Sequence, residues 1–89
     1  MPAPKKKRAN FALEAPEAES VYVAGSFNDW DASARQLRPD KKGVWRTWMN
    51  LPPGAHEYLF VVDGEWREDP CCEKRAPNPY GSHNSVLKL

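Results

Sequence analysis

The sequence predicts an all-β protein that folds as one small antiparallel sandwich. Apolar residues alternate with a period of two in several segments, and no segment sustains the helical period. Gly and Pro punctuate these segments at the spacing typical of short strands joined by turns. A chain of 89 residues has room for only one modest core. A deep active-site cleft is therefore not expected.

The segments "NFALE" and "SVYVAGSF" begin the alternating pattern, and the short "VVDGEW" carries an Asp-Gly pair between apolar residues, the strongest short hairpin signal. The predicted strands lie at residues 10–14, 21–27, 43–51, 55–63, 65–68 and 84–89. Before them, "MPAPKKKRA" at 1–9 has a charge run and no periodic apolar residue, which predicts a disordered basic tail. The tail is interpreted as solubilising, with a nuclear-type signal or a nucleic-acid contact as the alternative. The sandwich is predicted to span 10–89.

The charge and the cysteines exclude several classes of function. Outside the tail, nine of the 13 basic residues are set against 12 acidic residues, which disfavours a nucleic-acid-binding face. No apolar stretch is long enough to span a bilayer and no export signal follows the basic run, so a cytoplasmic protein without a membrane partner is expected. The adjacent Cys71 and Cys72 are expected to be free thiols, and with His56 and His83 they do not match a metal motif. No metal and no cofactor are expected.

The aromatic residues exceed what one thin core can hold. In "VWRTWMNL" the face that buries Trp45 leaves Trp48 outside. Trp30 in "NDWD", Trp66 in "GEWRED" and Tyr80 in "NPYGS" lie among amides, carboxylates and hydroxyls, which is typical of a surface site. Aromatic faces beside such groups suit a sugar ring, although packing at the ends of the sandwich is an alternative for each of the three.

Catalysis is the first rival to binding, because glycoside hydrolysis requires two carboxylates flanking the bond. The candidate acids fit turns and solvated rims better than a catalytic pair, and no nucleophile, base and oxyanion group occur together. We therefore expect no enzymatic activity. The candidate acids are Asp29, Asp31, Asp63, Glu65, Glu68 and Asp69.

Three motifs, "SVYVAGSFNDW", "GVWRTWMNLPPGAHEYLFVVDGEWREDP" and "NPYGSHNSVLKL", resemble in order and spacing the family 48 carbohydrate-binding modules, as in the glycogen-binding domain of the AMP-activated protein kinase beta subunit and of branching and debranching enzymes. The resemblance covers roughly residues 11–89. It implies an immunoglobulin-like (early set) β-sandwich that binds α-1,4-linked glucans such as glycogen or starch without cleaving them.

The resemblance also implies the roles of single residues. Trp30 and Trp66 match the two stacking walls, and Tyr80 matches the residue that inserts against the curved glucan. Ser82 and Asn84 match two hydrogen-bonding positions. The implied ligand is an α-glucan polysaccharide or a maltooligosaccharide, and the implied protein partner is a glucan-metabolising enzyme or a kinase subunit acting in trans.

The pattern departs from the family at Leu59, where the kinase-type domain has a Lys that bonds a sugar hydroxyl. The loss of one such bond is worth about 1 to 2 kcal/mol. Leu59 and Val61 are expected to share an exposed apolar patch with Trp48, because consecutive antiparallel strands bring such side chains together. Two readings stay open for this patch: it extends the glucan platform, or it contacts a partner. The alternative for the whole chain is a protein-interaction module of the same fold whose sugar binding is weakened or lost.

Overall fold

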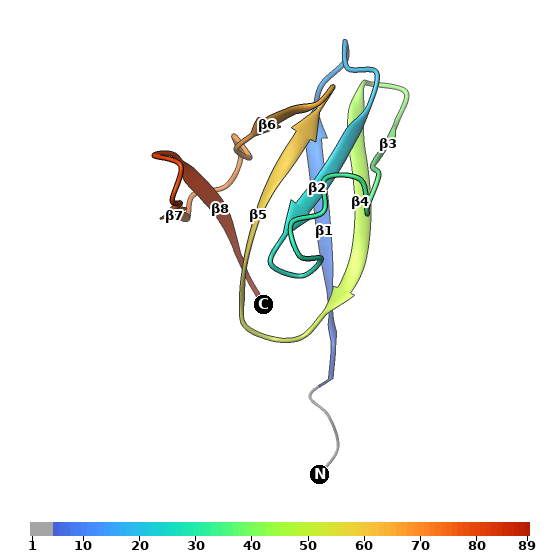
Figure 1. The fold of residues 1–89 in the computed structure, drawn as a ribbon. Helices are drawn as coiled ribbons and strands as arrows, with labels where there is room; N and C mark the ends of the chain where they lie inside the picture. Colours follow the sequence, from blue (N-terminus) through green and yellow to red (C-terminus); the bar gives the residue numbers. More distant parts are fainter. Residues whose placement is uncertain (1–4) are drawn as a thin grey trace.

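The computed structural model describes residues 5–89, which form two antiparallel sheets facing each other in a sandwich and contain no helix (Figure 1). The all-β, immunoglobulin-like prediction is confirmed. One sheet has the order β1-β4-β3, and the other has the order β2-β5-β8-β7 with β6 paired to β5. The strands are β1 (Lys7–Glu14), β2 (Val21–Gly25), β3 (Arg38–Pro39), β4 (Val44–Leu51), β5 (Ala55–Val62), β6 (Glu65–Arg67), β7 (Arg75–Pro77) and β8 (His83–Lys88).

The three-stranded sheet is built on the long pairing of β1 with β4, which runs from Lys7 opposite Leu51 to Glu14 opposite Val44. In β1 every second side chain from Ala9 to Leu13 is buried. In β4 the alternation buries Trp45 and exposes Trp48, as predicted. Because cross-strand partners lie on the same face of a sheet, one face of this sheet packs inward and the other faces solvent.

The five-stranded sheet is centred on β5, which pairs with β2, β6 and β8. The β5–β6 connection is the predicted hairpin: Asp63 and Gly64 both have positive φ, as a two-residue type I′ turn requires. Asp63 is further fixed because its carboxylate accepts hydrogen bonds from the backbone N–H groups of Glu19 and Ser20, each at 2.9 Å. This acid, one of the catalytic candidates, therefore shapes a turn.

The core lies between the two sheets and uses the alternate residues of both. Tyr58 is central, with edge-on ring contacts to Phe11 of the facing sheet and Phe60 of its own strand. Leu37 is fully buried although it lies outside every predicted strand, because residues 35–37 run beside β2 and bond to it. The core cluster is Ala9, Phe11, Leu13, Val21, Val23, Leu37, Trp45, Leu51, Tyr58, Phe60 and Val62.

The boundary predicted between tail and sandwich lies too late in the sequence. Strand β1 begins at Lys7 and Ala9 is buried, so the last three residues of the predicted tail belong to the sheet. Pairing with β4 supplies the partners for this backbone, a long-range effect that local composition does not show. Residues 1–4 of the predicted tail lie outside the described residues.

The predicted patch of Trp48, Leu59 and Val61 is wrong. Strands β4 and β5 are consecutive, but they belong to different sheets, so the outward faces that carry Trp48 and Leu59 lie on opposite sides of the sandwich. Val61 is moreover only 5% exposed, since the β6 strand folds back and pairs Trp66 with it. Trp48, Leu59 and Val61 therefore form neither an extension of the glucan platform nor a single contact surface for a partner.

Candidate glucan-binding groove

A single groove on the outer face of the five-stranded sheet brings together the aromatic residues that the sequence singles out. The register explains the location: Tyr58 and Ser85 are opposite one another and buried, so Glu57, Leu59 and Asn84, their chain neighbours, point outward. The groove is lined by Ser26, Trp30, Glu57, Leu59, Trp66, Glu68, Pro77, Asn78, Pro79, Tyr80, Ser82 and Asn84.

Trp30 is half-buried and stands in a tight loop after β2. Asn28 organises this loop, because its side chain accepts a hydrogen bond from the Gly25 N–H at 3.0 Å and donates one to the Val23 carbonyl at 3.2 Å. Asp29 and Trp30 both have a left-handed backbone, with φ of 54° and 59°. Such φ values are rare for residues other than Gly, so the loop holds Trp30 in a strained but fixed position.

Trp66 reaches the groove from the β6 strand and is 49% exposed. Its place follows from the hairpin at Asp63 and Gly64, which sets Trp66 opposite Val61 on the outward side of β5. Leu59 is two residues from Val61 on the same side, so it also lines the groove, close to the apolar wall that Trp66 provides. The side chain that departs from the family pattern is thus part of the candidate site.

Tyr80 is 91% exposed at the tip of the loop between β7 and β8. The loop is organised by Asn78, whose side-chain oxygen accepts hydrogen bonds from the N–H groups of Tyr80 and Ser82, each at 3.0 Å. The backbone N–H of Asn78 also donates to the Ser82 carbonyl at 2.9 Å. Sequence reasoning missed Asn78, although an Asn that begins a turn and bonds the N–H two residues later is a recognised signal.

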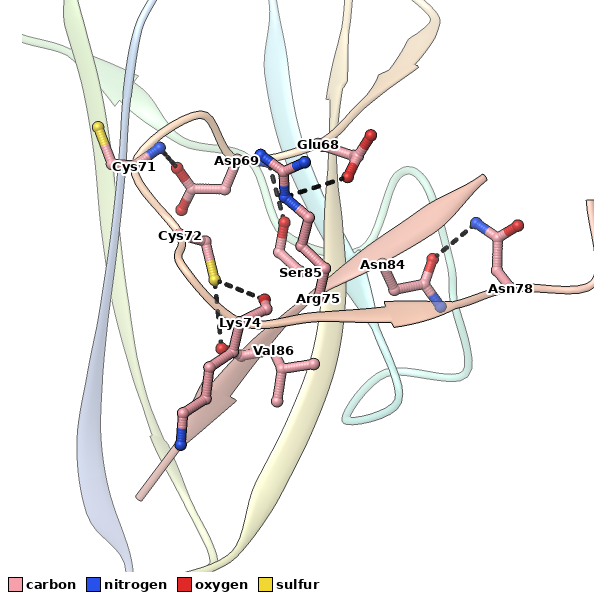
Figure 2. A network of polar contacts seen from close by, with 10 residues as sticks. All are labelled: Glu68, Asp69, Cys71, Cys72, Lys74, Arg75, Asn78, Asn84, Ser85 and Val86. Atoms are coloured by element: carbon pink, nitrogen blue, oxygen red, sulfur yellow. Dashed lines mark hydrogen bonds and ion pairs between the residues drawn. The ribbon is translucent and has the colours of Figure 1, made fainter. Parts of the chain in front are cut away.

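Ser82 and Asn84 have different roles in the structure. Ser82 is exposed beside the groove, whereas Asn84 is only 8% exposed. The Asn84 amide donates to a Glu57 carboxylate oxygen at 3.2 Å. It also accepts a hydrogen bond from Asn78 at 3.1 Å (Figure 2). Asn84 therefore ties β5, β8 and the Tyr80 loop together beneath the groove, with capacity for further hydrogen bonds from its amide.

A buried polar network supports the groove from the interior side of β8, and Figure 2 shows its contact between Asp69 and Ser85. Tyr58 donates a hydrogen bond to Asp69 at 2.6 Å, and Ser85 accepts one from the Asp69 N–H at 2.9 Å. Burial and the Asp69 carboxylate raise the pKa of the Tyr58 hydroxyl, so this hydroxyl is a permanent donor. Asp69, another catalytic candidate, is therefore a structural acceptor at the start of the 69–77 segment.

The two cysteines are free thiols in the structure, as expected. Cys71 is exposed, and the Cys72 sulfur contacts the carbonyls of Lys74 and Val86 at 3.1 and 3.3 Å (Figure 2). Within residues 5–89 no group of three or more His, Cys, Asp or Glu side chains is arranged to hold a metal ion. The same part of the chain contains no helix of the length and apolarity needed to cross a membrane.

Comparison with known proteins defines the family. Residues 10–89 match the family model described as the glycogen recognition site of AMP-activated protein kinase. The chain belongs to this family. The resemblance inferred from the three motifs, and with it the predicted class of function, recognition of a glucan, is confirmed at the level of the family.

Relatives come from plants and animals. The chain is 40% identical over 72 residues to the chloroplastic protein FLOURY ENDOSPERM 6 of Oryza sativa subsp. japonica. The matched region covers 81% of this chain and 13% of the rice protein. It is 38% identical over 53 residues to the chloroplastic PTST homolog 2 of Arabidopsis thaliana, which covers 60% of this chain and 10% of that protein. It is 34% identical over 71 residues to 5′-AMP-activated protein kinase subunit beta-1 of Sus scrofa, which covers 80% of this chain and 55% of the pig sequence.

Two consequences follow from these relatives. The chain spans 13%, 10% and 55% of the lengths of these three family members, so it corresponds to one region of each. The cytoplasmic location expected from the sequence is contradicted, because the rice and Arabidopsis relatives are chloroplastic proteins. That expectation rested on composition and on the absence of a recognisable signal, and neither property reports the compartment of a family member.

Proposed function

We propose that the chain binds an α-1,4-linked glucan in the groove and does not cleave it. The observation that carries the proposal is the convergence of Trp30, Trp66 and Tyr80, from two loops and the β6 strand, onto one groove. A packing role at the ends of the sandwich would not require these side chains to meet. The family match to a glycogen recognition site supports the same ligand class.

Each group in the groove has a contact that it is suited to make. Trp30 and Trp66 offer flat apolar surfaces for the C–H faces of glucose rings, and the curved path of an α-1,4 chain suits two walls that approach from different strands. Tyr80, on its exposed loop, contacts the open side of the chain. Ser82 supplies a hydroxyl, and Asn84 supplies the part of its amide that Glu57 and Asn78 do not use.

Binding without hydrolysis is supported by the state of the acids in the groove. Glu57 accepts a hydrogen bond from Asn84, and Glu68 lies 3.7 Å from the Arg75 guanidinium in an ion pair. Glu57 is thus engaged by a hydrogen bond, and Glu68 is held only at ion-pair distance, with one buried oxygen that lacks a hydrogen-bond donor. Glycoside hydrolysis needs one carboxyl group to protonate the leaving oxygen and another to attack or to activate water, and the engagement of Glu57 by Asn84 opposes either role. Incubation of the chain with maltoheptaose should release no new reducing ends.

Isothermal titration with maltoheptaose tests the proposal. Trp30→Ala and Trp66→Ala should each weaken binding by about thirtyfold, since truncating a central aromatic contact costs about 2 kcal/mol. Trp48→Ala is the matched control, because Trp48 is 47% exposed on the opposite face. The stacking model fails if Trp48→Ala weakens binding as much as the groove variants do, or if cellohexaose binds as well as maltoheptaose.

The second candidate function is a protein-interaction module with weakened sugar binding, and Leu59 is the observation that favours it. A leucine in the groove offers no hydrogen bond to a sugar hydroxyl. In either case the protein partners that we propose are a glucan-metabolising enzyme or a kinase subunit acting in trans. Absence of any heat of binding with maltoheptaose, together with an intact fold, would favour this second function over the first.

A further inference from the structure

The charges of the molecule are unevenly distributed along the chain. The segments 5–14 and 35–51, which contain the three-stranded sheet, its loops and the stretch 35–37 that leads into it, hold nine of the 13 basic residues and only two of the 12 acidic residues, Glu14 and Asp40. The other four basic and ten acidic residues belong to the rest of the chain, and most of these acids lie in connections between strands. The small net charge of +1 therefore conceals a strongly polarised molecule.

The basic side chains gather on the solvent face of the three-stranded sheet. Along β4, Arg46, Trp48 and Asn50 are all exposed and share one face. The register adds Arg8 opposite Asn50 on β1 and Arg38 opposite Arg46 on β3. We call Arg8, Arg38, Arg46 and Trp48 the basic face.

The Arg8 side chain covers one face of the Trp48 indole and so limits which ligands can stack on it. The Arg8 guanidinium lies over the indole, 4.3 Å from the ring centroid. Arg35 donates hydrogen bonds to the Trp48 carbonyl and, at 3.1 Å, to the Thr47 hydroxyl, which fixes the strand beneath the indole. A sugar or a nucleobase would have to displace Arg8 in order to stack on that side of the ring.

A carboxylate does not meet this obstacle. A guanidinium stacked on an aromatic ring keeps its N–H edge open, and that edge matches the two oxygens of a carboxylate. Arg46 is held at 3.3 Å by Asp40, so it is oriented on the surface while it remains largely exposed. Tryptophan and arginine together are also the residues most enriched at the energetic centres of protein interfaces.

We propose that the basic face docks an acidic segment of a partner protein, rich in Asp or Glu. The face lies on the opposite side of the sandwich from the groove, so a partner held there leaves the groove open. The charged residues that line the groove, Glu57 and Glu68, are both acidic and disfavour docking of the same segment there. The docking surface does not depend on the proposed function of the groove.

Fluorescence anisotropy with a short labelled Glu-rich peptide tests this inference at low salt, without glucan. The peptide should bind, and the same peptide with Gln in place of Glu should not. The variant that carries both Arg8→Gln and Arg46→Gln should bind at least about fivefold more weakly. The charge-matched control carries Lys74→Gln and Lys88→Gln, which remove two positive charges outside the basic face, and it should bind nearly as the unmodified chain does.

Several results would overturn the proposal. Equal losses in the two double variants would mean that net charge alone attracts the peptide. Equal binding of the Glu and Gln peptides would exclude carboxylate recognition. Tighter binding of a single-stranded oligonucleotide, or of phosphatidylserine vesicles, would assign the face to a different class of partner. Thermal unfolding of each variant shows whether the fold is retained, and Trp48→Phe, which keeps an aromatic ring under Arg8, gives a second variant that should preserve binding.

Discussion

Asn78 provides the sharpest test of how the groove is built, because it holds the Tyr80 loop without being one of the aromatic contacts. Its side chain makes three hydrogen bonds: it accepts from the N–H groups of Tyr80 and Ser82 and donates to the Asn84 amide oxygen. Asn78→Ala removes all three. Asn78→Asp keeps an acceptor for the two N–H groups and removes only the donor.

The magnitude follows from these contacts. A hydrogen bond within a protein has a net worth of about 1 kcal/mol, and the partly exposed setting here reduces the sum of three to about 2 kcal/mol. This free energy favours the ordered loop over alternative conformations. Loss of that order should weaken maltoheptaose binding by up to about thirtyfold in Asn78→Ala, and by about threefold in Asn78→Asp. The core should be little affected, since it is formed by other residues.

Two measurements separate the loop from the fold. Titration calorimetry gives the affinity for maltoheptaose, and backbone amide hydrogen exchange at Tyr80 and Ser82 reports the order of the loop directly. We expect faster exchange and weaker binding together in Asn78→Ala. Faster exchange with unchanged affinity would refute the reasoning, because it would show that a preformed Tyr80 loop contributes nothing to recognition.

Two further predictions concern Leu59, which lines the groove, and Tyr58, which lies in the core beneath it. Leu59→Lys places an ammonium donor among the groove residues and should strengthen maltoheptaose binding by about fivefold, whereas Leu59→Met, which has no donor, should not. If calorimetry gives equal affinities for the unmodified chain and both variants, residue 59 does not contact the ligand. Tyr58→Phe removes the hydroxyl that donates to the buried Asp69 carboxylate at 2.6 Å. The loss should lower the free energy of unfolding by about 2 kcal/mol and Tm by about 10 °C. An unchanged Tm in thermal unfolding would show that this hydrogen bond does not stabilise the fold.

Local sequence patterns correctly predicted the structural features that involve only one strand or one hairpin. The alternation in β4 correctly separated Trp45 from Trp48, because burial of one face is decided by the strand itself. The Asp63-Gly64 turn was also predicted, since its φ values are a property of the two residues. The resemblance assembled Trp30, Trp66 and Tyr80 as candidates; all three line one groove, and their part in binding stays a prediction.

The errors concern information that no local pattern contains. The "PPG" turn between β4 and β5 reads as a hairpin, but the chain crosses there from one sheet to the other. That crossing separated Trp48 from Leu59, and the fold-back of β6 buried Val61. Leu37 entered the core through pairing beside β2. Asn78 is the exception, because its turn carries a local signal and only its bond to Asn84 on β8 depends on the fold.

The left-handed backbone at Asp29 and Trp30 has a thermodynamic consequence for ligand binding. The free-energy cost of this strained backbone is incurred when the chain folds. The hydrogen bonds of Asn28 then keep the loop in that conformation before any ligand binds. A wall that is already rigid loses little conformational entropy on association. Calorimetry should therefore show the Trp30 contribution mainly as enthalpy, and replacement of Asn28, which loosens the wall, should appear as a larger entropic penalty at similar enthalpy.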